Sequence, residues 1–193
     1  IELFKRCHLN ALLFDHVIDQ PFMRRQELIH PNVGFVRIDS DIEALFQGSL
    51  RDGDEAKVEK LTGKIRHALG GRLGKMELKI TNLEEPSITT LIINDEKSRR
   101  MADMLEIYGM IKPADTSLKE LQSKSTFLVN LNNDIVRYVL DSPDSDRKGQ
   151  ADLILNQLFD LALMSQGALN IEDVEGFILR SESLIGQLIQ SCK

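Results

Sequence analysis

The sequence contains no tryptophan, and aromatic residues make up only 5% of its 193 positions. Cysteine is equally scarce, with Cys7 near one end of the chain and Cys192 near the other. Small disulfide-stabilised secreted folds carry more cysteines than this, so we expect two free thiols in a reducing compartment. No apolar run approaches the roughly 20 residues that a helix needs to span a bilayer, so we expect no membrane partner.

Basic residues are also in the minority. The formal net charge is −6, and the longest basic clusters are the pairs Arg24-Arg25 and Arg99-Arg100. An acidic surface repels a phosphate backbone, so we predict no binding to nucleic acid. The overall composition is ordinary, with 42% hydrophobic and 28% charged residues, which indicates a globular rather than a disordered chain.

The start of the chain resembles neither a complete protein nor a secreted one. It opens with Ile1-Glu2-Leu3-Phe4, without an initiator methionine and without a basic region followed by an apolar stretch. We therefore expect no secretory signal peptide, and we expect a fragment of a longer cytoplasmic protein.

Motifs for nucleotide and metal chemistry are missing. Neither the phosphate-loop pattern Gly-x-x-x-x-Gly-Lys-Ser/Thr nor the nucleophile pattern Gly-x-Ser-x-Gly occurs. The glycine-rich segment Gly70-Gly71-Arg72-Leu73-Gly74 closes a predicted helix instead of following a strand, so we interpret it as a helix C-cap. The four histidines have no metal-ligand spacing; they are His8, His16, His30 and His67. We therefore predict no catalytic residue, metal or cofactor in this chain.

Aspartates near the start of the chain support one alternative. They flank the first predicted strands at Asp15, Asp19, Asp39 and Asp41. Carboxylates of this kind could hold a metal ion or form an acid/base pair, so a metal-dependent hydrolase stays open as an alternative function. Turns and helix caps account for the same residues without any chemistry.

The periodicity predicts an α+β fold in two parts. Residues 1–42 form a small αβ unit, too short to bury a core of its own. Its predicted elements are a short helix, a buried strand, a helix and an alternating strand, at residues 3–9, 11–14, from Pro21, and 33–38. Turn-forming residues crowd positions 40–54, so we place the domain boundary there and assign residues 43–193 to a second domain.

The second domain combines a mixed three-stranded sheet with helices. Its predicted strands lie at residues 76–80, 88–93 and 126–131, and its predicted helices at 54–69, 94–108, 134–140, 147–165 and 171–190. Asp54 is expected to cap the first of these helices and Gly70 to end it.

The last two predicted helices carry more apolar surface than one small sheet can cover. Residues 147–165 are apolar nearly all round, and residues 171–190 repeat apolar side chains at near-heptad spacing. The economical solution is a second copy, which gives a dimeric four-helix bundle across a two-fold axis. A monomeric helical cap on the sheet stays open as the alternative. The predicted dimer-interface residues are Ile154, Leu155, Leu158, Phe159, Leu161, Ala162, Phe177, Ile178, Leu184, Ile185 and Leu188.

A methionine-rich face lies on the predicted helix 94–108. Its apolar side chains recur at i, i+3, i+4 and i+7, and a further methionine follows; they are Met101, Met104, Leu105, Tyr108 and Met110. Flexible thioethers suit a surface that binds many sequences, but the same spacing also fits an ordinary core stripe.

Several segments resemble a known family in family order. They are Phe14–Phe22, Val36–Asp39, Glu96–Met101 with Tyr108–Met110, Leu128–Asn133, Leu158–Gly167 and Phe177–Ser181. Together they resemble the ninety-kilodalton heat-shock chaperones of the bacterial HtpG type, and they cover nearly the whole chain.

The resemblance implies a homodimeric, ATP-driven stress-response chaperone of which this chain is the C-terminal third. Residues 1–42 would then end the middle domain, and 43–193 would form the dimerisation domain. ATP and magnesium would bind to a preceding domain of the parent protein, so this part would not be an enzyme. The methionine-rich face would contact unfolded clients. A purely structural dimerisation module, without clients, is the remaining alternative.

Overall fold

The structure is a computed structural model of residues 1–193, and it describes residues 12–14, 18–35, 49–94, 125–143 and 149–191. The chain divides into two compact units. One contains Ile1–Leu45 with Asn94–Lys124, and the other contains Phe46–Ile93 with Ser125–Lys193.

The described part of the first unit contains one helix, α2 (Asp19–Ile29). No residue of this helix is buried. The ring of Phe14 packs edge-on against Phe35, with 5.8 Å between ring centroids, and the carboxylate of Glu27 accepts a hydrogen bond from the Phe35 N–H at 2.9 Å. These contacts close a small turn around the end of α2.

Of the elements predicted for residues 1–42, the helix is present as α2, but the described parts of the two strands are not in a sheet. Neither 12–14 nor 33–35 forms a strand, and Leu12 and Leu13 are 76% and 82% exposed. A strand needs a neighbouring strand for its backbone hydrogen bonds and a face to bury.

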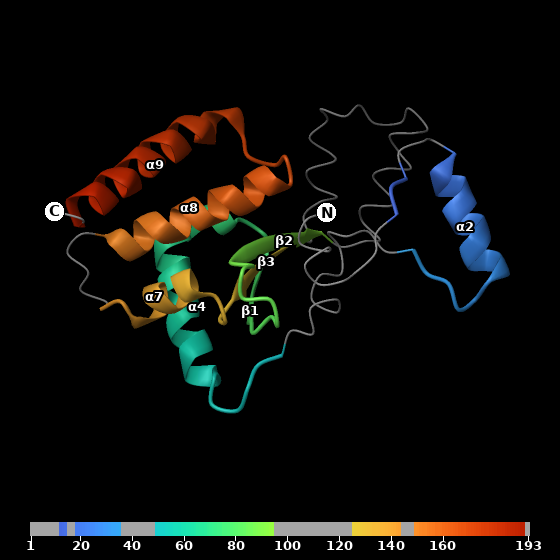
Figure 1. Ribbon diagram of the computed structural model, residues 1–193, viewed down its shortest axis with the longest axis horizontal. Helices are drawn as coiled ribbons and strands as arrows, with labels where there is room; N and C mark the ends of the chain where they lie inside the picture. Colours follow the sequence, from blue (N-terminus) through green and yellow to red (C-terminus); the bar gives the residue numbers. More distant parts are fainter. Residues whose placement is uncertain (1–11, 15–17, 36–48, 95–124, 144–148, 192–193) are drawn as a thin grey trace. The chain divides into compact units, whose positions relative to one another are not determined.

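The second unit is α+β, as predicted (Figure 1). Its elements are α4 (Glu55–Leu69), the 3₁₀ turn η1 (Gly70–Leu73), β1 (Glu77–Thr81), β2 (Thr90–Asn94), β3 (Ser125–Asn130), α7 (Asp134–Asp141), α8 (Gln150–Ser165) and α9 (Ile171–Ser191). The three strands form a mixed sheet in the order β1-β3-β2, with β1 parallel to β3 and Ile80 opposite Val129. The mixed three-stranded sheet is therefore confirmed.

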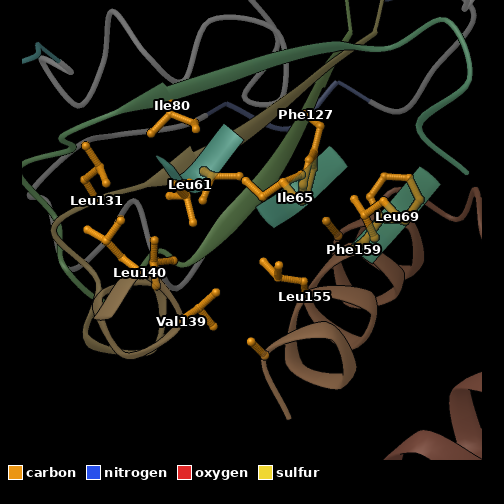
Figure 2. Packing of buried hydrophobic residues seen from close by; sticks show 14 of the residues in the cluster. Leu61, Ile65, Leu69, Ile80, Phe127, Leu131, Val139, Leu140, Leu155 and Phe159 are labelled. Carbon is orange, nitrogen blue, oxygen red and sulfur yellow. The ribbon is translucent and has the colours of Figure 1, made fainter. Parts of the chain in front are cut away.

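The core lies between the sheet and helices α4, α7 and α8 (Figure 2). Helix α4 buries Leu61, Ile65 and Leu69, which recur at helical spacing. Phe127 of β3 meets Phe159 of α8 edge to face, with ring centroids 5.0 Å apart. Each of these side chains contributes about 1.5–3 kcal/mol by leaving water, so this cluster holds the unit together.

The two ends of α4 differ in how far they follow the prediction. Gly70 ends the helix with a φ of +50°, and its N–H donates to the Arg66 carbonyl. Asp54 occupies the N-cap position, but its side chain makes no capping bond. Its carboxylate instead accepts from Lys57 Nζ at 2.8 Å, Asn82 Nδ2 at 2.7 Å and the Arg51 N–H at 3.1 Å.

Asp54 therefore joins α4 to the segment after β1. The hydrogen bond from Lys57, and then those from Asn82 and the Arg51 backbone, lower the pKa of Asp54 from 3.8 to about 2. The ionised carboxylate is the form that these donors stabilise.

Asn130 connects the sheet to the segment between β1 and β2. It is fully buried, and its side-chain amide makes four hydrogen bonds to backbone groups. Oδ1 accepts from the N–H groups of Leu83 (2.9 Å) and Asn132 (3.0 Å), and Nδ2 donates to the carbonyls of Glu85 (3.1 Å) and Ile88 (2.8 Å). One side chain thus satisfies backbone groups that would otherwise lack partners.

Helix α7 is fixed at both ends. Asn133 is the N-cap residue, and its Oδ1 accepts from the Ile135 N–H at 2.9 Å. At the other end, Lys64 of α4 donates to the Val139 carbonyl at 3.1 Å and to Ser142 Oγ at 2.9 Å. A cation among the last carbonyls of a helix also interacts favourably with the helix dipole.

Candidate functional site

The candidate functional site is the surface of the last two helices, α8 and α9, that the rest of the chain leaves exposed. Helices α8 and α9 lie side by side and are joined by residues 166–170 (Figure 1). Gly167 allows this reversal, since its φ is +64° and its N–H donates to the Met164 carbonyl at 3.0 Å. Glycine reaches this left-handed conformation without a steric penalty.

One side of α8 belongs to the core of the single chain. Four of the predicted interface residues lie there, between 2% and 7% exposed: Leu155, Leu158, Phe159 and Ala162. They have almost no surface left to offer a second copy. Ile154 is half-buried against the same core, whereas Leu161 is 46% exposed.

Helix α9 differs from α8 in its burial. None of residues 171–190 is buried. Among the predicted interface residues, Phe177 and Leu184 are half-buried, and Ile178, Ile185 and Leu188 are exposed.

We use the name apolar stripe for five exposed side chains on one flank of α9. They are Val174, Ile178, Ile185, Leu188 and Ile189, from 38% to 66% exposed. Their spacing of about one or two helical turns puts them in a row beside the surface that faces α8. The two helices run antiparallel, so helical spacing puts Leu161 of α8 on this same flank. Exposed apolar side chains gathered along one flank of a helix are a candidate interaction surface.

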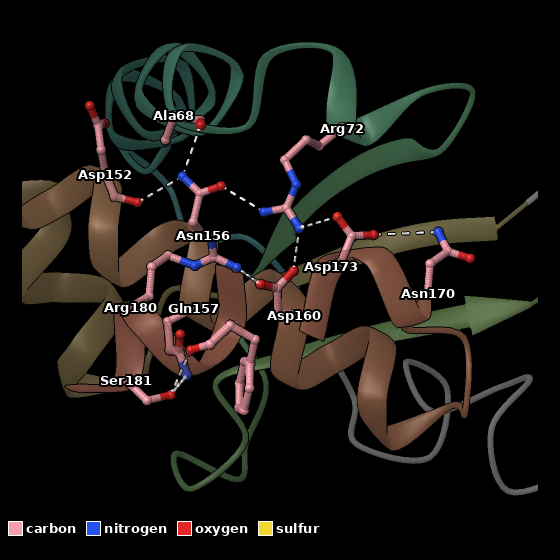
Figure 3. Close-up of polar contacts among 11 residues, drawn as sticks. Ala68, Arg72, Asp152, Asn156, Gln157, Asp160, Asn170, Asp173, Arg180 and Ser181 are labelled. Carbon is pink, nitrogen blue, oxygen red and sulfur yellow. Dashed lines mark hydrogen bonds and ion pairs between the residues drawn. The ribbon is translucent and has the colours of Figure 1, made fainter. Parts of the chain in front are cut away.

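A buried ion triad holds α9 against α8 (Figure 3). Asp160 of α8 is fully buried. One of its carboxylate oxygens accepts from Arg72 of η1, and the other accepts from Arg180 of α9. Arg72 also donates to Asn156 Oδ1 at 2.7 Å and lies 5.4 Å from the ring centre of Phe159.

Two further polar contacts join the helices. Gln157 Nε2 donates to Ser181 Oγ at 2.8 Å, and Gln150 Nε2 donates to Gln187 Oε1 at 2.9 Å. Among the described residues, Gln157 Oε1 and Arg180 Nε are buried without a hydrogen-bond partner. Polar contacts therefore hold α9 against α8, although these two buried atoms lack a hydrogen-bond partner.

The sequence analysis missed the ion triad. Asp160 lies inside the apolar segment of α8, and that position was itself a signal, because a carboxylate on a buried helix needs a cationic partner. The identity of the partners was not readable, since Arg72 lies 88 positions from Asp160 in the sequence.

A shallow polar hollow of about 880 Å³ lies elsewhere on the second unit. Its lining residues are Ser49, Arg51, Asn82, Glu84, Pro86, Asn132, Asp134 and Arg137. The side chain of Arg137 is already engaged by the Leu131 carbonyl and Asn132 Oδ1, both at 3.2 Å. The mixed charges of this hollow select no particular ligand.

Other predicted site residues lie outside the described part of the chain. They are the client-binding residues Met101, Met104, Leu105, Tyr108 and Met110, and the aspartates Asp15, Asp39 and Asp41. Within the described residues, no group of three or more His, Cys, Asp and Glu side chains is placed to hold a metal ion. No helix in the described segments has the length and apolar character needed to cross a membrane.

No family model and no curated protein matches this chain. The resemblance to the heat-shock chaperones therefore stays a prediction.

Proposed function

We propose that this chain is a self-association module that forms a homodimer through the apolar stripe of α9 and the adjoining flank of α8. The observation that carries the proposal is the exposure of α9: residues 171–190 include no buried side chain, although apolar side chains line one flank. Complete burial of an Ile or Leu side chain is worth about 1.5–3 kcal/mol, and these side chains are about half-exposed, so each would gain roughly half of that free energy from a partner on this flank.

A second copy is the partner that fits the geometry best. A two-fold axis across the stripe would place the same five side chains against themselves, and α8 and α9 of both copies would form a four-helix bundle. In the monomeric alternative the last two helices cap the sheet, and the apolar stripe of α9 stays exposed to solvent. The packing of α9 on α8, and of α8 on α4 and α7, supports the dimer because it leaves this flank of α9 uncovered.

For the biological role, we propose the C-terminal part of a cytoplasmic, ATP-dependent chaperone of the ninety-kilodalton heat-shock family. The order of the resembling motifs supports this role. In this proposal the chain supplies dimerisation and part of the client surface. ATP and magnesium act in another domain of the parent protein.

Light scattering after size-exclusion chromatography tests the dimer. The double variant Ile178→Glu/Leu188→Glu should elute as a folded monomer, since both side chains are exposed in the single chain. Leu179→Glu is the matched control, because Leu179 is 60% exposed on the same helix but lies off the apolar stripe. The control should stay dimeric. A double variant that remains dimeric at micromolar concentration would overturn the proposal.

A further inference from the structure

Helix α9 contributes no buried apolar side chain that would define its register, meaning its position and rotation, on α8. The residues of α9 from 171 to 190 are half-buried or exposed, so apolar packing alone leaves the helix free to rotate or shift along α8. A rotation by one residue turns a helix face by about 100°, and a shift by one turn moves it by about 5.4 Å. Either change would move the apolar stripe away from a symmetric partner.

We propose that Asp160 is a positioning residue that fixes this register through Arg72 and Arg180. The inference rests on the proposed dimer, because its consequence is the shape of the dimer surface. The fully buried carboxylate has two oxygens, and each oxygen is occupied by a guanidinium from a different element. Arg72 belongs to η1, next to α4, and Arg180 belongs to α9, so the triad locates α9 relative to the core.

The chemistry of the triad favours positioning over simple stabilisation. Buried ion pairs often add little net stability compared with apolar side chains of equal size, because both charges lose water. A planar guanidinium, however, meets a carboxylate in few orientations, so it defines direction as well as distance. The unpaired Arg180 Nε and Gln157 Oε1 agree with this role, since the contact is not optimised for stability.

Gly176 gives independent support. A Cβ atom at this position would lie 3.2 Å from Nη1 of Arg180 and 3.7 Å from its Nη2. Glycine inside a helix lowers helix stability relative to alanine, so it needs a local reason. Here the missing side chain leaves room for Arg180 to turn back along α9 and reach Asp160. Gly186 on the same helix has no atom within 4 Å of its own hypothetical Cβ.

Backbone hydrogen exchange on the full chain tests the inference. The background is Ile178→Glu/Leu188→Glu, so that docking of α9 is observed without a partner. Adding Arg180→Gln should speed exchange of α9 amides at least tenfold and leave α4 amides unchanged, because an undocked helix frays. Arg180→Lys keeps one charged donor and should restore part of the protection. A merely structural role would instead change exchange in α4 as well.

The two glycines supply the matched pair. Gly186→Ala should slow exchange in α9 by about fivefold, the equivalent of the usual ~1 kcal/mol preference for alanine in a helix. Gly176→Ala should speed it, because the new methyl group displaces Arg180.

The outcomes separate this inference from the dimer itself. Without the background substitutions, Arg180→Gln should raise the dimer dissociation constant at least tenfold. Unchanged α9 exchange in Arg180→Gln, or equal effects of the two alanine variants, would overturn the positioning role even if the chain is dimeric. If the wild-type chain is monomeric and Arg180→Gln still speeds α9 exchange, the positioning of α9 is supported and the proposed dimer is overturned.

Discussion

Replacing Phe159 with leucine should destabilise the single chain without weakening the dimer. Phe159 is only 2% exposed, and its ring contacts Phe127 edge to face at 5.0 Å. The guanidinium of Arg72 lies 5.4 Å from the centre of the same ring. Leucine fills much of the volume but loses both ring contacts. An aromatic pair is worth about 0.5–1.5 kcal/mol and a cation–π contact about 0.5–2 kcal/mol, so the expected loss is about 1–3 kcal/mol.

Urea unfolding and thermal melting of the monomeric Ile178→Glu/Leu188→Glu background measure this loss. In a chain of this length, 1 kcal/mol corresponds to about 2–4 °C, so the melting temperature should fall by about 2–12 °C. Leu179→Ala is the control and should change stability by less than about 0.5 kcal/mol, since its side chain is exposed. Unchanged unfolding in this background, together with a weaker dimer when Phe159→Leu is made in the wild-type chain, would refute the reasoning and return Phe159 to the interface.

Two further predictions concern Asp54 and the methionine-rich face. The pKa of Asp54 is lowered to about 2, so the folded state favours its ionised form; this stabilisation is complete above about pH 4 and is lost as the pH falls from 3.8 towards 2. Asp54→Asn should therefore flatten the pH dependence of the free energy of unfolding in that interval, and an unchanged slope would show that the carboxylate is not stabilised as described. The proposed client role requires Met101 and Leu105 to be exposed, and exposed substitutions change stability by less than about 0.5 kcal/mol, so Met101→Ser/Leu105→Ser should melt within a degree or two of wild type and lose the ability to prevent aggregation of an unfolded client. A large fall in melting temperature would instead assign these residues to a core.

Local signals made parts of this fold predictable. The stripe of α4 and its end at Gly70 depend on helical spacing and on a backbone conformation that glycine adopts easily. The helix cap by Asn133 depends on the N–H groups of Ile135 and Val136, which follow it within three positions. Signals of this range are contained in the sequence itself.

Other features depend on contacts between distant segments. The apolar residues of α8 suggested an interface, but spacing alone cannot say which of them meet the chain's own core. Leu155, Phe159 and Ala162 lie in that core because α4 packs against their side of α8. The strand predicted at residues 11–14 failed for a related reason, since apolar character alone supplies no neighbouring strand.

The partners of Asp160 were the least predictable part of the site. Arg72 and Arg180 lie 88 and 20 positions away, and only the packed arrangement of η1, α8 and α9 brings them together. The exposed flank of α9, by contrast, follows from its near-heptad spacing. The spacing of apolar residues therefore predicts the exposed flank of α9, whereas the ion triad that holds α9 against α8 is seen only in the structure.

Sedimentation equilibrium of the wild-type chain tests the central claim most directly. Self-association makes the average mass depend on concentration, so a series from about 0.1 to 100 μM covers dissociation constants across the micromolar range. A homodimer predicts a limiting mass of twice the 21.9 kDa of one chain. A mass that stays at 21.9 kDa up to the highest concentration would contradict the dimer.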